Sequence, residues 1–182
     1  DHYSAAGQKW LLAGGGTGIC YVKRDVQDQV WPLMGGPPRE GATATRYESV
    51  GQHNVPSVLG MADAVDLQET IGKRNIEERD RQLSTRLKEG LKEIPGVHLW
   101  TSSDRGLSAG ITLFSVHDIP MRNVVTALFD EFRVHIRTMG TGNLNGVRAS
   151  THFYNMPHEV DRLLEGVRHI AANAGNYMTT AA

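Results

Sequence analysis

The sequence has 182 residues and a mass of 20.0 kDa, a length that suits one domain or parts of two. Its composition, 40% hydrophobic and 21% charged, is typical of a chain that buries a core, which argues against a disordered protein. The 19 basic and 20 acidic residues leave a net charge of −1, so the chain lacks the broad basic surface of a nucleic-acid-binding protein.

The first third of the chain is predicted to form strands and loops. Two apolar runs flank the glycine-rich turn AGGGTG within residues 10–22, a pattern typical of a β-hairpin. Glycines and prolines predict a loop over residues 31–47. Because residues 1–55 have too few apolar side chains for a core of their own, we expect them to need a partner sheet.

Helical spacing of apolar residues predicts a helix from Pro56 to Ile71 and a second helix that stops at Pro95-Gly96. The elements predicted after it are strands at 97–100 and 110–116, a helix at 121–132, strands at 133–137 and 147–150, and a helix at 157–172. Residues 75–175 therefore indicate a compact α/β unit with the order strand–strand–helix–strand–strand–helix.

Two short motifs suggest chemistry but lack its structural context. GLSAG at 106–110 matches the nucleophile elbow of hydrolases, which needs a helix after the serine, whereas a strand-like run follows Ser108. AGGGTG at 13–18 lacks the Gly-Lys-Ser/Thr ending of a phosphate-binding P-loop and the third glycine of a dinucleotide fingerprint. We interpret both as turns, and the second also as backbone that could pass close to a ligand.

The sequence gives no signal for a metal, a membrane or secretion. The 8 histidines and 1 cysteine have no recognised metal-ligand spacing, so no metal is expected. No run approaches about 18 apolar residues, so no membrane-spanning helix is expected. A lone cysteine, Cys20, suits a reducing compartment, and a cytoplasmic location is expected for a chain without a targeting signal.

Lys9 and Arg148 are the candidate reactive and binding residues. Lys9 precedes the apolar run that starts at Trp10; if this segment packs, burial disfavours the ammonium, and a neutral amine can form a Schiff base with a carbonyl. Arg148 lies in a short predicted strand, where a guanidinium could grip a carboxylate with two parallel hydrogen bonds. Taken one at a time, a solvent-exposed lysine and a structural ion pair are the favoured alternatives.

Three segments taken in order strengthen the functional interpretation. They are D-H-Y-x-x-A-x-Q-K-W-L-x-x-G-G-G-T-G from Asp1, ESVGQHN at 48–54, and R-A-S-T-H-F-Y-N-M-P-H-E-V-D-R-L from Arg148. They resemble the lysine segment, the Gly-Thr-x-Asn loop and the C-terminal segment of the class V aminotransferase family, most of all its isopenicillin N epimerase-like and selenocysteine lyase-like members. These are fold-type I enzymes that use pyridoxal 5′-phosphate (PLP).

The resemblance implies an α/β fold, the C-terminal part of a fold-type I PLP-dependent transferase. Residues 1–55 would be the last strands and loops of the large PLP-binding domain, at the end of its sheet. Residues 56–74 would be a connecting helix, and residues 75–182 the small C-terminal α/β domain. Family members are about twice as long, and their N-terminal half supplies much of the cofactor site. We therefore expect this chain to work with an N-terminal half, nicked or separate, and neither to fold stably nor to turn over substrate alone.

The resemblance also implies residue roles. Lys9 would form the internal aldimine with PLP and later move the α-proton, and Arg148 would bind the α-carboxylate of an amino-acid substrate. Gln8 and Gln52 would contact the cofactor, with Gln52 reaching the phosphate of a neighbouring subunit in a homodimer. The family usually has His at position 8, Thr at position 52, and a Ser or Thr hydroxyl where Ala6 stands. These departures predict a weaker or differently built phosphate site.

The reaction itself is left open among several chemistries at the α-carbon. Desulfurases of the family carry a reactive cysteine shortly before the carboxylate arginine, but FRVHIRTMGTGNLNG contains none and Cys20 is far away in sequence, which argues against a persulfide mechanism. We expect an aminotransferase or epimerase. The alternatives are a C–S lyase working by β-elimination, and a non-catalytic interaction module with a degenerate site.

Overall fold

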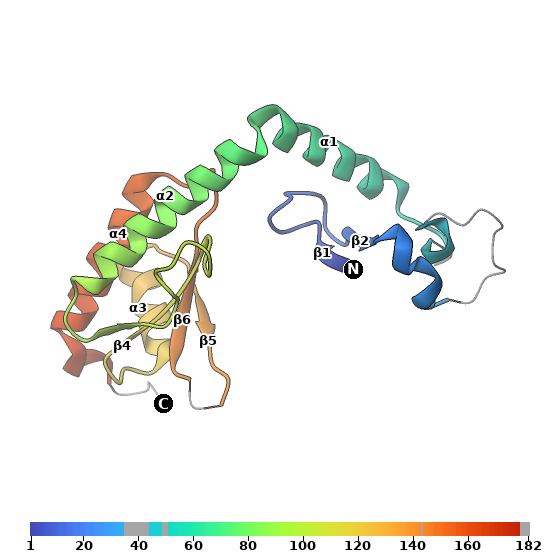
Figure 1. The fold of residues 1–182 in the computed structure, drawn as a ribbon. Helices are drawn as coiled ribbons and strands as arrows, with labels where there is room; N and C mark the ends of the chain where they lie inside the picture. Colours follow the sequence, from blue (N-terminus) through green and yellow to red (C-terminus); the bar gives the residue numbers. More distant parts are fainter. Residues whose placement is uncertain (35–43, 49–50, 143, 179–182) are drawn as a thin grey trace. The chain divides into compact units, whose positions relative to one another are not determined.

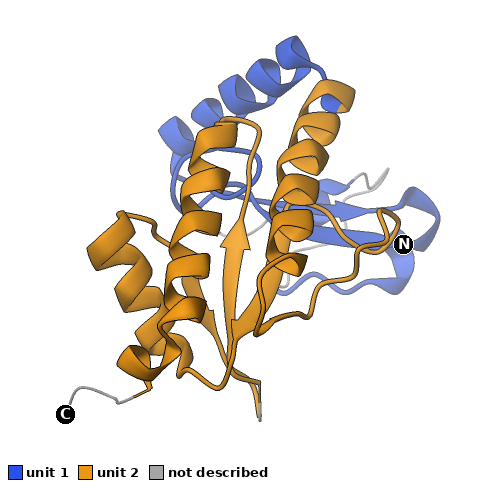
Figure 2. Ribbon diagram, turned by 90° about the vertical axis from the view of Figure 1, so that its left-hand side faces the viewer, with its two compact units in different colours: residues 1–73 blue, residues 74–182 orange. Residues whose placement is uncertain are grey.

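The computed structural model describes residues 1–34, 44–48, 51–142 and 144–178. The chain divides into two compact units, residues 1–73 and residues 74–182 (Figure 1; Figure 2). No described helix is both long enough and apolar enough to cross a membrane.

A two-stranded antiparallel sheet opens the first unit. β1 (His2–Ala6) pairs with β2 (Gly18–Val22), so that Ala6 lies opposite Gly18. The hairpin predicted within residues 10–22 is therefore half right: its second strand forms, but the partner strand lies further upstream. The reason is that residues 7–13 close on themselves, since the Ala13 N–H donates to the Gly7 carbonyl (3.0 Å) and the Leu12 N–H to the Lys9 carbonyl (3.0 Å).

The rest of the first unit is helical. Two short 3₁₀ segments, η1 (Arg24–Gln29) and η2 (Ala44–Tyr47), precede α1 (Val55–Ile71). The Asn54 side chain accepts the backbone N–H of Ser57 (3.3 Å) and so caps the start of α1. Part of the loop predicted at 31–47 and part of the 48–54 segment lie outside the described residues.

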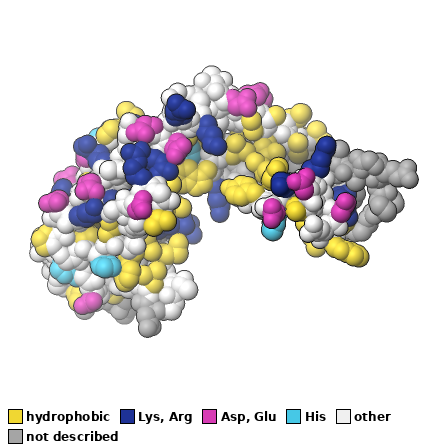
Figure 3. Space-filling model, in the orientation of Figure 1, with side chains coloured by type: hydrophobic (Ala, Val, Ile, Leu, Met, Phe, Trp, Pro, Cys, Tyr) yellow, Lys and Arg dark blue, Asp and Glu magenta, His cyan; other side chains and the backbone are white. Residues whose placement is uncertain are grey.

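The first unit exposes much of its apolar surface. Its buried apolar side chains, among the described residues, are Ala13, Val22 and Ala64. Large apolar side chains are exposed along α1, namely Val55, Val58, Leu59, Val65 and Leu67; yellow hydrophobic groups are prominent on the face drawn in Figure 3. The apolar core of the described residues of this unit is therefore small.

The second unit is an α/β sandwich of two layers. Its elements are α2 (Lys73–Lys92, which begins one residue before the unit), β3 (Val97–Leu99), β4 (Ile111–Val116), α3 (Met121–Phe132), β5 (Arg137–Met139), β6 (Gly146–Ser150), α4 (Pro157–Ala172) and the short η3 (Ala174–Tyr177). The strands form one sheet in the order β3-β4-β6-β5, with antiparallel neighbours. The predicted order of strands and helices is confirmed.

Helices α2, α3 and α4 cover one face of this sheet (Figure 2). Alternate residues of the central strands, such as Phe114 and Val147, are buried against helical residues such as Leu87, Leu128 and Val167. Because side chains alternate along a strand, the residues between them point to the opposite face, which no helix of this unit covers among the described residues.

The largest difference from the predicted elements is at β5. The pattern predicts a strand over 133–137, but β5 begins only at Arg137. Arg133 adopts a left-handed conformation (φ 55°, ψ 35°) at the end of α3, and the Val134 N–H donates to the Leu128 carbonyl (3.0 Å). This tight helix end directs the chain away from the sheet, so residues 133–136 run without a strand partner.

Gly166 lets α4 approach α3 closely. A Cβ at this position would lie 2.7 Å from Leu128 Cδ2 and 3.0 Å from Phe132 Cγ. Gly166→Ala is therefore expected to lower the free energy of unfolding of the assembled protein by about 1–3 kcal/mol, measured by urea denaturation. Gly175→Ala is the matched control, because a Cβ there meets no atom within 4 Å. Equal effects of the two substitutions would contradict this account of the α3–α4 contact.

Candidate active site

Lys9 lies in the turn that follows β1, in the first unit. Its side chain is exposed, and among the described residues no hydrogen bond or ion pair engages its amine. Trp10 and Leu12 are 39% and 38% exposed. The expected burial of this segment is not found within residues 1–73, because the unit offers too few apolar partners. No described contact of the amine stands in the way of a bond between Nζ and a carbonyl carbon.

Gln8 and Gln52 are exposed in the same unit. Gln8 adjoins Lys9 in the turn, and Gln52 lies two residues before the α1 cap, Asn54. No described side-chain hydrogen bond engages either amide, so both can donate to an anion such as a phosphate oxygen. Ala6 ends β1 and has no donor on its side chain.

Arg148 projects from the middle of β6 in the second unit. It lies opposite Leu113 on β4 and opposite Arg137 on β5. Arg148 is half-buried, and its Nε atom is buried without a hydrogen-bond partner. A buried donor without an acceptor costs free energy, since it has lost its water and gained nothing in exchange.

Arg137 makes this position more strongly cationic. Residues directly opposite on antiparallel strands point to the same face, so the two guanidinium groups share the face that α2, α3 and α4 leave uncovered. Within the described residues no ion pair engages either arginine. Like charges placed opposite each other destabilise a sheet, and a bound anion would remove both this repulsion and the cost of the unpartnered Nε.

The sequence predicted Arg148 but missed Arg137. The two are separated by a loop and come together only through strand register, which the linear pattern does not show. The signal that could have found Arg137 is the alternation of residues 133–137, which places Arg137 on the polar face of the predicted strand.

The segment after β6 holds the Arg148 strand in place. The Thr151 N–H donates to the Gly110 carbonyl (2.8 Å), and Arg79 Nη2 on α2 donates to the Asn155 carbonyl (3.0 Å). At the start of α4, Glu159 Oε2 accepts the Met156 N–H (2.7 Å) and the Asn155 amide (3.2 Å). Both hydrogen bonds lower the pKa of Glu159 below its usual value, and the bond from the Met156 N–H has the larger effect.

The pKa of Glu159 predicts a pH-dependent contribution to stability. Because the folded state lowers this pKa, the carboxylate stabilises the fold above its ordinary pKa of about 4.5, and the gain is lost as the pH falls further. Glu159→Gln is expected to lower the unfolding free energy by about 0.5–1 kcal/mol at pH 7, as for a helix cap, and by progressively less below pH 4.5. Urea unfolding of both proteins across this range measures the difference. A gap that persists at pH 2 would contradict the role of the charge.

The GLSAG and AGGGTG segments are turns, as interpreted from the sequence. Ser108 Oγ donates to the Asp104 carbonyl (3.0 Å) and accepts from Lys88 Nζ (2.7 Å), and β4 follows it. Burial lowers the pKa of Lys88, with further contributions from Arg81 and Lys92. AGGGTG lies in the connection from β1 to β2, where Thr17 Oγ1 donates to the Gly14 carbonyl (2.7 Å). In the described part of the chain no three His, Cys, Asp or Glu side chains gather to hold a metal.

Comparison with known proteins decides the family. The family model for class-V aminotransferases matches residues 1–163. The chain belongs to the class-V aminotransferase family. Relatives in this family include the isopenicillin N epimerase of Amycolatopsis lactamdurans, 28% identical over 94% of this chain and 47% of the relative. They also include a probable cysteine desulfurase of Pyrococcus abyssi, 28% identical over 90% of this chain and 45% of the relative.

Solved structures give the same fold. The apo cysteine desulfurase of Thermococcus onnurineus NA1 has a TM-score of 0.79 at 26% identity, over 94% of this chain and 47% of the desulfurase. The cystine C–S lyase C-DES, solved with its product cysteine persulfide, has a TM-score of 0.78 at 24% identity, over 92% of this chain and 46% of the lyase. A further C-DES structure has glycine covalently linked to its PLP cofactor.

This member of the class-V aminotransferase family thus has the fold of the C-terminal part of a fold-type I PLP-dependent enzyme, as expected from the resemblance. It spans about half the length of the curated relatives it matches.

Proposed function

We propose that the chain is the C-terminal part of a PLP-dependent enzyme that acts at the α-carbon of an amino acid, as an aminotransferase or an epimerase. The observation that carries the proposal is the cationic pair on the uncovered sheet face: Arg148, with its buried unpartnered Nε, beside Arg137. A carboxylate bound there would satisfy both groups, and every α-amino acid carries one.

The residues of the first unit fit the cofactor. The unengaged amine of Lys9 can bond to the PLP aldehyde, and the amides of Gln8 and Gln52 can donate to its phosphate. Ala6 offers no such donor. When bound, PLP supplies an electron sink that makes the α C–H of an amino acid acidic. Lys9 Nζ would then take the α-proton and deliver it in the next step, to the α-carbon in an epimerase and away from it in an aminotransferase, while Arg148 would hold the carboxylate and fix which face of the α-carbon is presented.

The position of the single cysteine argues against a desulfurase reaction. Cys20 lies exposed on β2 in the first unit, and residues 131–146 before Arg148 contain no cysteine. Persulfide formation needs a reactive thiolate at the substrate sulfur. β-Elimination needs a base at the α-proton and a leaving group on the substrate rather than a protein thiol, so a C–S lyase is the second candidate.

The enzyme we propose is larger than this chain. Because the chain spans about half the length of its curated relatives, we propose that it acts with a polypeptide that supplies the N-terminal half of the fold, nicked or separate. The exposed apolar side chains along α1 give such a partner a surface to cover. We further propose a homodimer in which Gln52 reaches the cofactor phosphate of the neighbouring subunit.

Borohydride reduction tests the function. The complete protein is saturated with PLP, reduced with borohydride and digested, and the peptides are mapped by mass spectrometry. We expect a phosphopyridoxyl group on Lys9. A saturated protein without this adduct would favour the alternative, an interaction module with a degenerate site, to which Ala6 and Gln8 point.

Product analysis separates the reactions. A panel of amino acids is incubated with the holoenzyme, and the products are separated on a chiral column. A keto acid with transfer of the amino group indicates an aminotransferase, and the opposite enantiomer indicates an epimerase. Pyruvate and ammonia released from cystine would indicate the lyase instead.

A further inference from the structure

Lys88 of α2 is buried without a carboxylate partner. It is 5% exposed, and of the Lys, Arg, Asp and Glu residues in the described part of the chain it is the one that is buried. No ion pair engages it among the described residues. A buried ammonium without a counter-ion loses its hydration and gains no attraction in exchange, so the site favours the neutral amine. The same burial lowers the pKa of Lys88.

The Lys88 amine contacts a serine hydroxyl. Lys88 Nζ lies 2.7 Å from Ser108 Oγ, which also lies 3.0 Å from the Asp104 carbonyl oxygen. A charged amine donates to Oγ, and the hydroxyl then donates to the carbonyl. A neutral amine carries a lone pair, which can accept the hydroxyl hydrogen over the same 2.7 Å. That contact is the one between a nucleophile and its general base.

The loop before β4 holds the serine beside the lysine. Arg81 Nη1, also on α2, donates to the Ser108 carbonyl (3.0 Å). Within the loop, Asp104 accepts the Gly106 N–H on Oδ1 (2.8 Å) and the Leu107 N–H on its carbonyl (3.1 Å). A base and a nucleophile that are already in position need little further ordering before they react. Because α2 supplies the base, the serine does not need the helix that follows it in a nucleophile elbow.

A substrate can reach Ser108 from solvent. Ser108 is partly exposed, and its two neighbours in the chain, Leu107 and Ala109, are exposed. No described hydrogen bond engages the backbone N–H of Ser108 or of Ala109. Backbone N–H groups next to a nucleophile are the donors that stabilise the oxyanion formed when a carbonyl is attacked, so the loop also offers that part of the chemistry.

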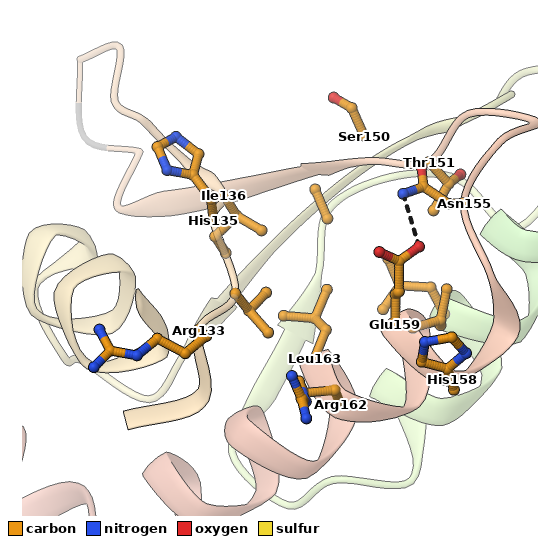
Figure 4. A pocket seen from close by; sticks show the side chains of 14 residues that line it. Arg133, His135, Ile136, Ser150, Thr151, Asn155, His158, Glu159, Arg162 and Leu163 are labelled. Carbon is orange, nitrogen blue, oxygen red and sulfur yellow. Dashed lines mark hydrogen bonds between the residues drawn. The ribbon is translucent and has the colours of Figure 1, made fainter. Parts of the chain in front are cut away.

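The Lys88–Ser108 pair lies apart from the cavity of the second unit. That cavity, of about 320 Å³, has Arg133, Glu159 and Arg162 among its lining residues (Figure 4), but neither Lys88 nor Ser108. A substrate of Ser108 would therefore bind at the surface of the loop, where little of it is enclosed. Such a position suits a small acyl group and selects weakly by shape.

We propose that Ser108 is a nucleophile that takes the acyl group of a small carboxylic ester, with Lys88 as its general base. Lys88 Nζ takes the hydroxyl proton while Oγ bonds to the carbonyl carbon. The bond from that carbon to the alcohol oxygen then breaks, and the alcohol leaves with the proton from Nζ. Water attacks the acyl carbon in the same way, which releases the carboxylic acid and returns a proton to Ser108 Oγ. Neither Lys9 nor Arg148 takes part, so this reaction is independent of the proposed PLP chemistry.

A fluorophosphonate probe tests the nucleophile. A reactive serine bonds to the phosphorus of such a probe with loss of fluoride, and the labelled peptides of the assembled protein are mapped by mass spectrometry. We expect the label on Ser108. Ser103 is the internal control, because it is an exposed serine of the same loop with no described lysine contact. Labelling that is absent from Ser108, or equal on the two serines, would overturn the proposal.

Substitutions on α2 test the base. Lys88→Met removes the amine, and Lys88→Arg keeps a charged donor that cannot accept a proton. Each is expected to slow labelling of Ser108 about 100-fold or more. Lys73→Met removes an exposed cation from the same helix and should label at the wild-type rate. Undiminished labelling in either Lys88 variant, or an equal loss in Lys73→Met, would remove Lys88 from the reaction.

Ester turnover gives a second readout. The assembled protein is incubated with p-nitrophenyl acetate, and the release of p-nitrophenol is followed by absorbance. Ser108→Ala is expected to reduce this release to the same low rate as Lys88→Met, because the two residues act as one unit. Ser103→Ala is the matched control and should leave the rate unchanged. Equal release by the wild-type protein and Ser108→Ala would overturn the acyl transfer.

Discussion

Lys9→Ala is expected to abolish the covalent cofactor adduct and to lower turnover of the assembled enzyme by about 10³-fold or more. The reason is that, in the proposed mechanism, one amine would both attach the cofactor and move the α-proton, and removing a positioned proton carrier alone costs about 10²–10⁴-fold. The measurement combines mass spectrometry after borohydride reduction with a steady-state assay on the best amino acid.

Lys23→Ala is the control for this experiment. Lys23 lies in the same unit and pairs with Asp25 (2.9 Å) at the surface, so its loss removes a cation without touching the proposed site. Retained activity in the Lys9 variant, or equal losses in both variants, would remove Lys9 from the reaction.

Arg148→Lys is expected to raise KM for amino-acid substrates about 10- to 100-fold. Lysine keeps the positive charge but cannot make two parallel hydrogen bonds to a carboxylate, and a hydrogen bond to a charged group contributes about 1.5–3 kcal/mol. The measurement is the KM and kcat of each variant over a range of substrate concentrations.

Arg86→Lys is the matched control for this substitution. Arg86 makes two hydrogen bonds to Asp161 (2.7 and 2.8 Å), so it loses the same geometry at a solvent-exposed site. Its substitution should leave KM unchanged. An unaltered KM in the Arg148 variant would show that the substrate carboxylate binds elsewhere.

The helices could be predicted from the sequence because their signals are local. The predicted helix at 121–132 has the bounds of α3, and the one predicted from Pro56 to Ile71 differs from α1 by one residue. Apolar periodicity and prolines near the helix ends lie within a few residues of what they specify. A strand depends on hydrogen-bonding partners that are distant from it in the sequence. β1 has the weakly apolar sequence HYSAA, and β5 is displaced because the left-handed Arg133 turns the chain away.

The candidate site was predictable only in part for a related reason. Lys9 and Arg148 were identified by resemblance, since neither local composition nor spacing distinguishes them from ordinary surface or structural residues. Arg137 becomes a candidate only when register places it opposite Arg148. The burial expected for Lys9 failed because the apolar residues around it have too few partners within residues 1–73.

The facing arginines, Arg137 and Arg148, make melting temperature a test of the proposed carboxylate site. Any carboxylate that neutralises both groups stabilises only the folded chain, by about 2.7 kcal/mol at a concentration 100 times its dissociation constant. A thermal-shift screen of organic acids would therefore rank ligand chemistries before any catalytic assay exists. By the same mass action, citrate or sulfate in a purification buffer would compete for the position, so preparations for such a screen call for chloride salts.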